Sequence, residues 1–237
     1  MQSLESELET ARALKVDTLA DAIESIGFEC TRCGACCTGE AEDDHTATVF
    51  PDEVRELQES TERDWRDVAR PMPYGLADGE DGPEGETFEW ALQTDSCGDC
   101  AFYEEDDDGV GACVAHDDRP LICRTYPFSV ALDGTSQPMG AVVDSVALGA
   151  QREAGETGET GDEEGVVRAH ECEGLGRDIS RSDAEDLAAA LKERAVRELE
   201  EAIGVRDAYE PTAVASGEVV VHDSEGAKRP DGTPVDD

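Results

Sequence analysis

The chain has 237 residues and a formal net charge of −40, from 19 Lys and Arg against 59 Asp and Glu. Phosphate contacts need a basic face, so this balance excludes direct binding to nucleic acid or to an anionic membrane. No stretch is long and apolar enough to span a bilayer, and the N-terminal sequence MQSLESELET lacks the basic and apolar regions of a signal peptide. We therefore expect a cytoplasmic protein, in which disulfides are uncommon.

The chain is poor in large apolar residues. Leu, Val, Ile and Phe make up about 18% of it, which together with a high net charge is typical of disorder. However, the acidic residues are spread along the whole chain, and lysine occurs only at Lys15, Lys192 and Lys228. A pervasively acidic, lysine-poor surface is typical of halophilic proteins, because concentrated salt screens its self-repulsion. The composition favours a folded halophilic protein over an ordinary acidic or partly disordered one.

Apolar residues at three- and four-residue spacings predict helices near the N-terminus. The first helix covers 2–26 and ends at Gly27. A second covers 51–69, with Pro51 at its first position and Pro71 just beyond its end. We expect these helices to serve as scaffold.

A further helix follows the last cysteine. It begins at Ser182, Glu185 completes a capping box, and Gly204 follows the buried stripe as a C-cap.

The material between the helices predicts short strands and loops. Residues 86–93 and 126–132 have the composition of strands, and the second leads into a turn at Asp133-Gly134. Stretches rich in Gly, Glu and Asp have too few apolar residues to pack, and they predict solvated loops or tails at 77–86, 151–165 and 222–237.

Cysteines are the strongest feature of the sequence. Two residues between cysteines let a tight turn direct both sulfurs at one ion, and a nearby glycine allows positive φ. This C-x-x-C spacing occurs at Cys30–Cys33 and at Cys97–Cys100. An odd count, a cytoplasmic context and clustering at metal-ligand spacing argue against disulfides and against buried thiols acting as small apolar groups. The full set is Cys30, Cys33, Cys36, Cys37, Cys97, Cys100, Cys113, Cys123 and Cys172.

The dense run C-x-x-C-x-x-C-C predicts more than one metal site. Its first three cysteines match the spacing of bacterial iron–sulfur ferredoxins, but the fourth is adjacent and no proline follows. Because successive side chains diverge, we expect Cys36 and Cys37 to bind different ions. One joins Cys30 and Cys33, while the other reaches a second site with the later cysteines. Four-thiolate sites serve zinc and iron–sulfur clusters alike, so the spacing does not choose the metal.

The run CTRCGACC at 30–37 resembles the opening signature of the YkgJ-like cysteine-cluster family of zinc- or iron-chelating domains. The resemblance spans about 28–180 and continues in order through CAFY at 100–103, GAC at 111–113, RPLICRTYPF at 119–128 and CEGLG at 172–176. Glu173 stands where the family commonly has proline.

The resemblance implies a set of metal ligands and leaves Cys97 outside it. The implied cofactor is zinc or iron, with a [4Fe-4S] cluster as one form of the latter. The implied ligands are Cys30, Cys33, Cys36, Cys37, Cys100, Cys113, Cys123 and Cys172.

Basic side chains flank one of these cysteines. Four thiolates around Zn²⁺ or an oxidised four-iron cluster leave a site charge of about −2. Arg119 and Arg124 stand on either side of Cys123 in a chain that otherwise avoids basic residues, so we expect them to offset that charge or to bond the sulfurs. His116 and His170 lie near Cys113 and Cys172 and are alternative ligands.

The sequence contains no phosphate loop, dinucleotide fingerprint, H-E-x-x-H motif or nucleophile elbow, and it predicts no substrate pocket. We expect a metal-binding protein. The alternatives are an iron–sulfur oxidoreductase or electron-transfer protein, with an unidentified protein or redox partner, and an accessory protein related to flagellin lysine methylases, which are similar in cysteine pattern.

We expect a small, irregular, metal-stabilised α+β fold with flanking helices. The predicted organisation is an N-terminal helix at 1–27, a cysteine-cluster domain at 28–180, a C-terminal helix at 181–210 and an acidic disordered tail at 211–237.

Overall fold

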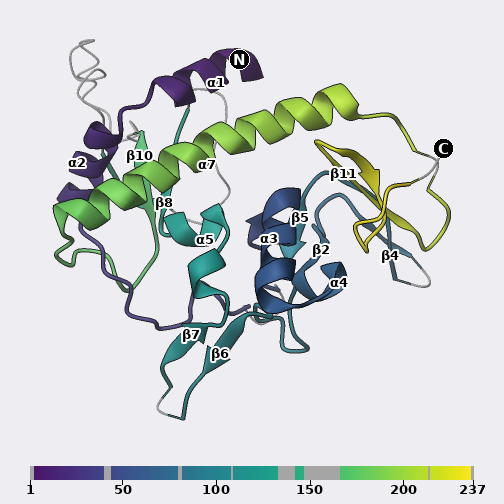
Figure 1. The fold of residues 1–237 in the computed structure, drawn as a ribbon, viewed down its shortest axis with the longest axis horizontal. Coiled ribbons are helices and arrows are strands. Elements are labelled where there is room, and N and C mark those ends of the chain that lie inside the picture. Colours follow the sequence, from purple (N-terminus) through teal and green to yellow (C-terminus); the bar gives the residue numbers. More distant parts are fainter. Residues whose placement is uncertain are drawn as a thin grey trace. The chain divides into compact units, whose positions relative to one another are not determined.

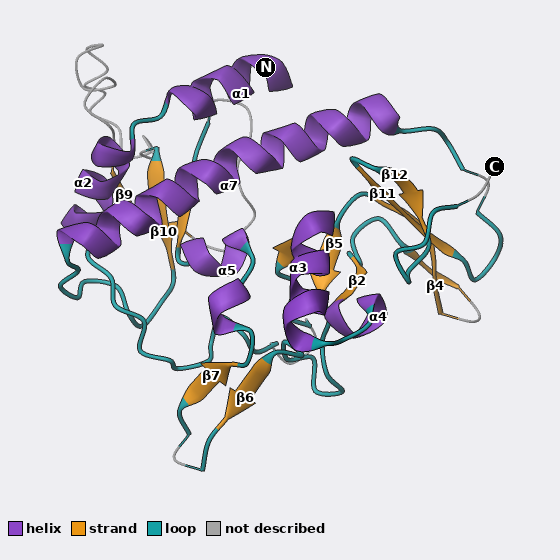
Figure 2. Cartoon of the chain, in the orientation of Figure 1, coloured by secondary structure: helices purple, strands orange, loops and turns teal. Residues whose placement is uncertain are grey.

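The computed structural model describes residues 3–39, 44–79, 82–107, 109–132, 142–146, 166–212 and 214–235. The chain divides into two compact units, and Figures 1 and 2 show their helices and strands. The first unit comprises Met1–Cys33 and Cys123–Leu199, and the second comprises Gly34–Ile122 and Glu200–Asp237. Helices and several small sheets are combined, which confirms the α+β class. Within the described ranges, no helix has both the length and the apolar character needed to cross a membrane.

The first unit is built around a three-stranded antiparallel sheet. The order of the strands is β8-β10-β9, and α2 packs against β10 and β9. The buried face of α2 carries Leu19 and Ile23. The elements of this unit are α1 (Leu4–Ala13), α2 (Val16–Ile26), β8 (Phe128–Val130), β9 (Val142–Val146), β10 (Val167–His170) and most of α7 (Arg181–Ala208).

The predicted helix at 2–26 is two helices. Leu14 and Lys15 have extended ψ angles of 136° and 124°, so the chain turns between α1 and α2. The physical reason is a break in the apolar face of the predicted helix. A continuous helix from Ala11 to Leu19 would place position 15 on the buried face, where the chain has lysine. The predicted end at Gly27 is confirmed.

The second unit contains separate small sheets. β5 lies between β1 and β2, β6 pairs with β7, and a four-stranded sheet has the order β12-β11-β4-β3. The strands are β1 (Thr48–Val49), β2 (Ala69–Pro71), β3 (Ala77–Gly79), β4 (Gly82–Thr87), β5 (Trp90–Leu92), β6 (Tyr103–Glu105), β7 (Gly111–Cys113), β11 (Val219–Asp223) and β12 (Gly226–Lys228). The helices are α3 (Pro51–Thr61), α4 (Trp65–Val68) and the 3-10 turn η1 (His116–Asp118), and α5 (Leu121–Thr125) crosses the boundary between the units.

The predicted helix at 51–69 is also interrupted. α3 ends at Thr61 because Glu62 adopts a left-handed conformation, with φ 55° and ψ 33°. The chain then restarts as α4, whose Trp65 meets the ring of Trp90 edge-on at 5.1 Å. Edge-to-face packing of two large rings stabilises the position of this second helix. Pro71, just beyond the predicted helix, is the last residue of strand β2.

Two predictions of solvated chain in the second unit are wrong. Ala77–Gly79 and Gly82–Thr87 pair as the antiparallel strands β3 and β4, and the proposed disordered tail at 211–237 contains β11 and β12. β11 pairs in parallel with β4, with Val221 opposite Thr87. Backbone hydrogen bonds do not require apolar side chains, so Gly- and Glu-rich segments can form this ladder. The predicted loop at 151–165 and the turn at Asp133-Gly134 lie outside the described residues.

The predicted strands are shorter than expected. The segment 86–93 is divided between β4 and β5, and 126–132 supplies only β8.

Helix α7 begins one residue before the predicted start at Ser182 and continues beyond the predicted C-cap at Gly204, within the predicted range 181–210. Ser180, rather than Ser182, caps it, with its Oγ accepting a hydrogen bond from the Asp183 backbone N–H at 3.1 Å. Gly204 is not the C-cap, because the helix continues to Ala208. A Cβ at position 204 would lie 2.5 Å from the Cβ of Ser224, so the glycine allows α7 to pass close to the β11–β12 turn.

Candidate metal centre

The boundary between the two units divides the cysteines. Cys30, Cys33, Cys123 and Cys172 belong to the first unit, and Cys36, Cys37, Cys97, Cys100 and Cys113 belong to the second. None of these nine residues, all of which are described, forms a disulfide. Each unit therefore contains enough thiols for a four-thiolate site, and the second has one more.

A tight turn presents Cys36 and Cys37. The Cys37 backbone N–H donates to the Gly34 carbonyl at 2.7 Å, which closes the turn. Gly34 has a positive φ of 79°, and a Cβ at this position would collide with the ring of Tyr103. Only glycine satisfies both conditions, which explains the residue that follows the first C-x-x-C pair.

The sulfur atoms of Cys36 and Cys37 lie 3.8 Å apart. The expectation that these successive side chains diverge is therefore wrong. An ion with tetrahedral bonds to sulfur of about 2.3 Å holds its ligands about 3.8 Å apart. The adjacent cysteines have the separation that two ligands of one ion require.

Cys100 enters from a loop that is held by Asp95. The Asp95 carboxylate accepts the backbone N–H of Cys97 at 2.7 Å and that of Asp99 at 3.2 Å. This loop is tied directly to the cysteine turn, because the Cys100 N–H donates to the Cys37 carbonyl at 2.8 Å. Cys100 is buried, whereas Cys97 is exposed, so the two members of this C-x-x-C pair occupy different environments.

Cys113 comes from the hairpin that follows Cys100. In the β6–β7 ladder it stands opposite Tyr103, and the Tyr103 N–H donates to the Cys100 carbonyl at 2.9 Å. Cys36, Cys100 and Cys113 lie within electrostatic range of one another. The second unit thus gathers Cys36, Cys37, Cys100 and Cys113 from the turn, the loop and the hairpin.

The thiols of this group differ in acidity. The hydrogen bond with Cys37 lowers the pKa of Cys36 to about 7, and the Arg119 cation contributes to the lowering. Burial raises the pKa of Cys100 to about 11 and also raises the pKa of Cys113. A bound metal cation favours the thiolate form, so it supplies the positive charge that the buried thiols need in order to ionise.

The structure places the two predicted arginines differently. Arg119 is half-buried, lies within electrostatic range of Cys36 and Cys113, and is held by its Nε–H bond to the His116 carbonyl at 2.9 Å. Arg124 is exposed on α5 and belongs to the first unit.

The two candidate histidine ligands have other partners. The His116 ring is exposed, and its Nδ1 lies 3.3 Å from Asp117. His170 is buried, with its Nε2 2.7 Å from the Ser129 hydroxyl.

His45, which the sequence does not single out, contacts the cysteine turn. Its Nε2 lies 3.2 Å from the Cys36 carbonyl, and its backbone N–H donates to the Gly98 carbonyl at 2.9 Å. Burial lowers the pKa of the ring. No spacing rule relates His45 to either cysteine loop, so only the tertiary structure reveals this contact.

In the first unit, backbone pairing brings the chain before Cys30 beside the chain after Cys172. Phe28 and Leu175 form a β-bridge, and the Glu29 N–H donates to the Gly174 carbonyl at 3.0 Å. The Gly174 N–H points toward the Cys172 sulfur at 3.4 Å. Such N–H donors stabilise a thiolate.

The same unit ties the segment after Cys123 to the segment before Cys172. The Tyr126 hydroxyl donates to the Glu171 carbonyl, and the His170 N–H donates to the Pro127 carbonyl at 2.9 Å. Cys123 and Cys172 are half-buried, while Cys30 and Cys33 are exposed. The first unit therefore joins the segments that carry all of its cysteines.

The side chains themselves are not in a closed coordination sphere. Among the described residues, no group of three or more Cys, His, Asp or Glu side chains is close enough to hold a metal ion as placed. The backbone segments that carry the cysteines are nevertheless held together, and the Cys36 and Cys37 sulfurs form a close pair. The donor set itself consists of soft thiolates, which suit zinc and iron.

Comparison with other proteins gives one match. No curated protein and no solved structure is significantly similar to the chain. The family model CxxCxxCC, described as a "putative zinc- or iron-chelating domain", matches residues 29–173, which is more than half of the chain. This range includes every cysteine of both units. The chain therefore belongs to the CxxCxxCC family.

Proposed function

We propose that the protein binds zinc or iron through two separate thiolate sites, one in each compact unit. Cys36, Cys37, Cys100 and Cys113 hold the ion of the second unit. Cys30, Cys33, Cys123 and Cys172 hold that of the first. This division replaces the expectation that Cys30 and Cys33 share an ion with one of the adjacent cysteines.

The 3.8 Å separation of the Cys36 and Cys37 sulfurs carries the proposal. It equals the spacing of about 3.8 Å that a single tetrahedral ion imposes on its sulfur ligands. In a four-iron cluster each cysteine binds a different iron, so the ligand sulfurs lie further apart. The pair therefore favours a mononuclear ion over a [4Fe-4S] cluster in the second unit.

The other side chains of the second unit suit this role. Arg119 offsets part of the negative charge that four thiolates leave around a divalent ion. The ion would link the turn at Cys36–Cys37, the loop at Cys100 and the hairpin at Cys113. Structural zinc contributes about 10–16 kcal/mol to the folding of small domains, so such a link adds stability where the apolar core is small.

Metal analysis of anaerobically purified protein tests the proposal. We expect about two zinc or iron ions per chain and no acid-labile sulfide, because eight thiolates fill about two four-thiolate sites. Cys37→Ser and Cys172→Ser should each remove about one ion, since the two residues belong to different units. The double variant should lose both.

Cys97→Ser is the matched control, because it removes an exposed thiol outside the proposed sets. It should retain the full metal content. Purified protein without zinc or iron would contradict the proposed function. A brown protein containing iron and acid-labile sulfide would instead assign the thiolates to an iron–sulfur cluster.

A further inference from the structure

His45 connects segments that carry metal-binding cysteines of the second unit. Its ring contacts the Cys36 carbonyl at 3.2 Å, and its backbone N–H bonds to the Gly98 carbonyl, two residues before Cys100. Its own carbonyl accepts a hydrogen bond from Arg70 Nη2 at 2.9 Å. One residue is thus fixed to the cysteine turn, to the Cys100 loop and to strand β2.

The orientation of the ring follows from its partner. A carbonyl oxygen can only accept a hydrogen bond, so Nε2 must carry the proton that it shares with Cys36. Nδ1 is buried and has no hydrogen-bond partner among the described residues. A buried acceptor without a partner costs about 1–3 kcal/mol, which an apolar side chain of similar size would avoid. The hydrogen bond to the Cys36 carbonyl is therefore the contact that a histidine makes at this position and an apolar side chain of similar size could not make.

The turn and the loop need this kind of connection because they are far apart in the sequence. The Cys100 N–H bonds to the Cys37 carbonyl, and the Gly39 N–H bonds to Asp99 Oδ1 at 2.9 Å. Both contacts fix the chain on the Cys37 side of the turn. The His45 ring is bonded at Cys36, so it restrains the other adjacent cysteine relative to the same loop.

We propose that His45 is the positioning residue of the second unit's metal site, fastening the Cys36–Cys37 turn to the loop that carries Cys100. The inference rests on the proposed function. His45 acts through the backbone and is not itself a ligand. Groups that orient metal ligands in this way typically contribute 10- to 100-fold to metal affinity.

The test measures zinc release from the full-length, zinc-loaded chain to a chromogenic chelator. His45→Leu keeps the volume and removes the donor, and among the described residues the side-chain hydrogen bond that it removes is the one to Cys36. We expect about one of the bound ions to leave about 10-fold faster, with the other unchanged. His45→Gln, whose amide N–H can reach the same carbonyl, should restore most of the retention.

The free energy of unfolding of each variant is measured separately on the metal-free protein.

His222→Gln is the matched control, because it alters a buried ring of the same unit that contacts Glu86, Phe88 and Tyr209 rather than a cysteine loop. It should leave both release rates unchanged. An unchanged rate in His45→Leu would overturn the proposal, and so would an equal loss in the Leu and Gln variants. Failure of the proposed function is distinct, because the unaltered chain would then retain no metal.

Discussion

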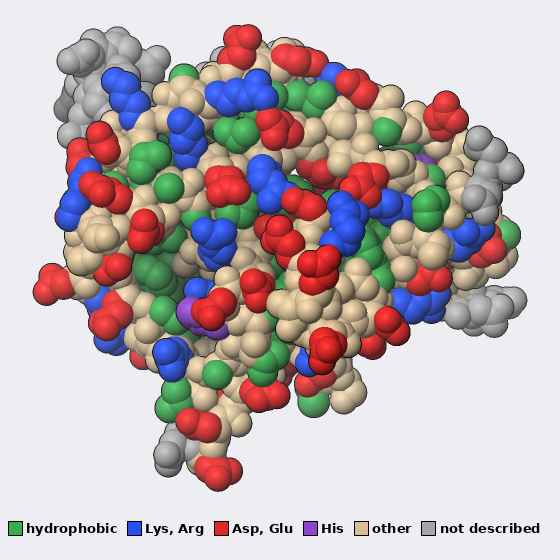
Figure 3. All heavy atoms as spheres, viewed as in Figure 1, with side chains coloured by type: hydrophobic (Ala, Val, Ile, Leu, Met, Phe, Trp, Pro, Cys, Tyr) green, Lys and Arg blue, Asp and Glu red, His purple; other side chains and the backbone are tan. Residues whose placement is uncertain are grey.

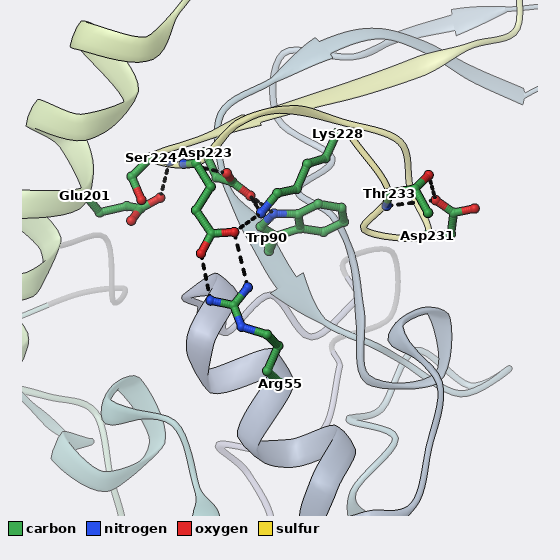
Figure 4. A network of polar contacts seen from close by, with 9 residues as sticks. Arg55, Trp90, Glu201, Asp223, Ser224, Lys228, Asp231 and Thr233 are labelled. Carbon is green, nitrogen blue, oxygen red and sulfur yellow. Dashed lines mark hydrogen bonds and ion pairs between the residues drawn. The ribbon is translucent and has the colours of Figure 1, made fainter. Parts of the chain in front are cut away.

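The indole Nε1–H of Trp90 donates a 2.9 Å hydrogen bond to the buried carboxylate of Asp223, 133 residues further along the chain. Lys228 lies 2.8 Å from the same carboxylate and 2.6 Å from Glu225. Glu225 in turn forms a two-pronged ion pair with Arg55 on α3. Figure 4 shows the Arg55, Trp90, Asp223 and Lys228 side chains of this network. This network attaches the β11–β12 hairpin to the rest of the second unit and explains why this acidic C-terminal segment is folded.

Asp223→Ala should lower the free energy of unfolding of the second unit by about 3 kcal/mol. The change leaves the Trp90 N–H without its acceptor and removes one partner of a buried ion pair. Trp65 and Trp90 are the two tryptophans of the chain, and both belong to this unit, so urea denaturation followed by their fluorescence measures the effect. Asp78→Ala removes an exposed carboxylate from β3 of the same sheet and should change the free energy of unfolding by less than about 0.5 kcal/mol. Equal effects of the two variants would contradict this role of Asp223.

The Glu225 ion pairs should add stability that depends on pH. The hydrogen bond from Arg55, followed by the contacts of Lys228, lowers the pKa of Glu225 from 4.5 to about 2. A lowered folded-state pKa contributes stability above the unfolded value, and this contribution is lost as the pH falls from about 4.5 to about 2. The side chain is 43% exposed, so solvent screening limits the contribution to about 1 kcal/mol or less.

The stability difference between the unaltered protein and Glu225→Gln isolates this contribution from the other carboxylates. It should be constant above about pH 5 and should vanish near pH 2. When Arg55→Gln is introduced into both the unaltered protein and the Glu225→Gln variant, the stability difference between the two at neutral pH should become smaller. A difference that grows on acidification would have the wrong sign for this ion pair.

Gly204→Ala should destabilise the second unit, although alanine normally favours a helix over glycine by about 1 kcal/mol. The added methyl group would meet the Cβ of Ser224 at 2.5 Å, and we expect a net loss of about 1–3 kcal/mol from this overpacking. Ser224→Gly removes the colliding atom and keeps the backbone N–H that bonds Glu201 at 2.8 Å. The double variant should therefore be more stable than the two single losses predict, as measured by chemical denaturation. Simple additivity would argue against the contact.

Arg119→Ala should weaken metal retention in the second unit. Its guanidinium lies within electrostatic range of Cys36 and Cys113, and its removal leaves the thiolate charge less compensated. We expect about 10-fold faster release of one ion to a chelator, with little change in the other. Arg124→Ala, which removes an exposed cation of the first unit, is the matched control for the second unit's ion. Identical release profiles for Arg119→Ala and the unaltered protein would remove Arg119 from the site.

Stability should rise with salt concentration. The net charge is −40, and the acidic side chains are scattered across the face that Figure 3 shows rather than gathered in one patch. Repulsion among them is screened as the Debye length falls from about 10 Å at 0.1 M salt to about 3 Å at 1 M. We expect the urea midpoint to increase steadily with KCl, beyond the increase that a neutral osmolyte at equal osmolality gives. A urea midpoint that stays the same from dilute buffer to high KCl would contradict the halophilic interpretation.

The sequence by itself determined the family of this protein. Its ordered cysteine motifs resemble those of the zinc- or iron-chelating family, and ligands at short separations must lie close together whatever the rest of the chain does. Apolar periodicity located most of the helical residues, since a stripe such as Leu187, Leu191, Ala195 and Leu199 depends on local geometry. Where the stripe was broken, as at Lys15, the sequence already contained the reason for the interruption.

Tertiary structure decided what depends on contacts between distant segments. The pairing of β11 with β4 uses backbone groups, which no side-chain pattern reveals, so a polar tail and a Gly-rich loop became strands. Gly204 lies inside a helix at a point where a side chain would collide with Ser224, so a close tertiary contact rather than helix capping accounts for this glycine. The common direction of the Cys36 and Cys37 sulfurs and the contact of His45 likewise arise from the folded turn, since the same residues in an extended chain would point apart.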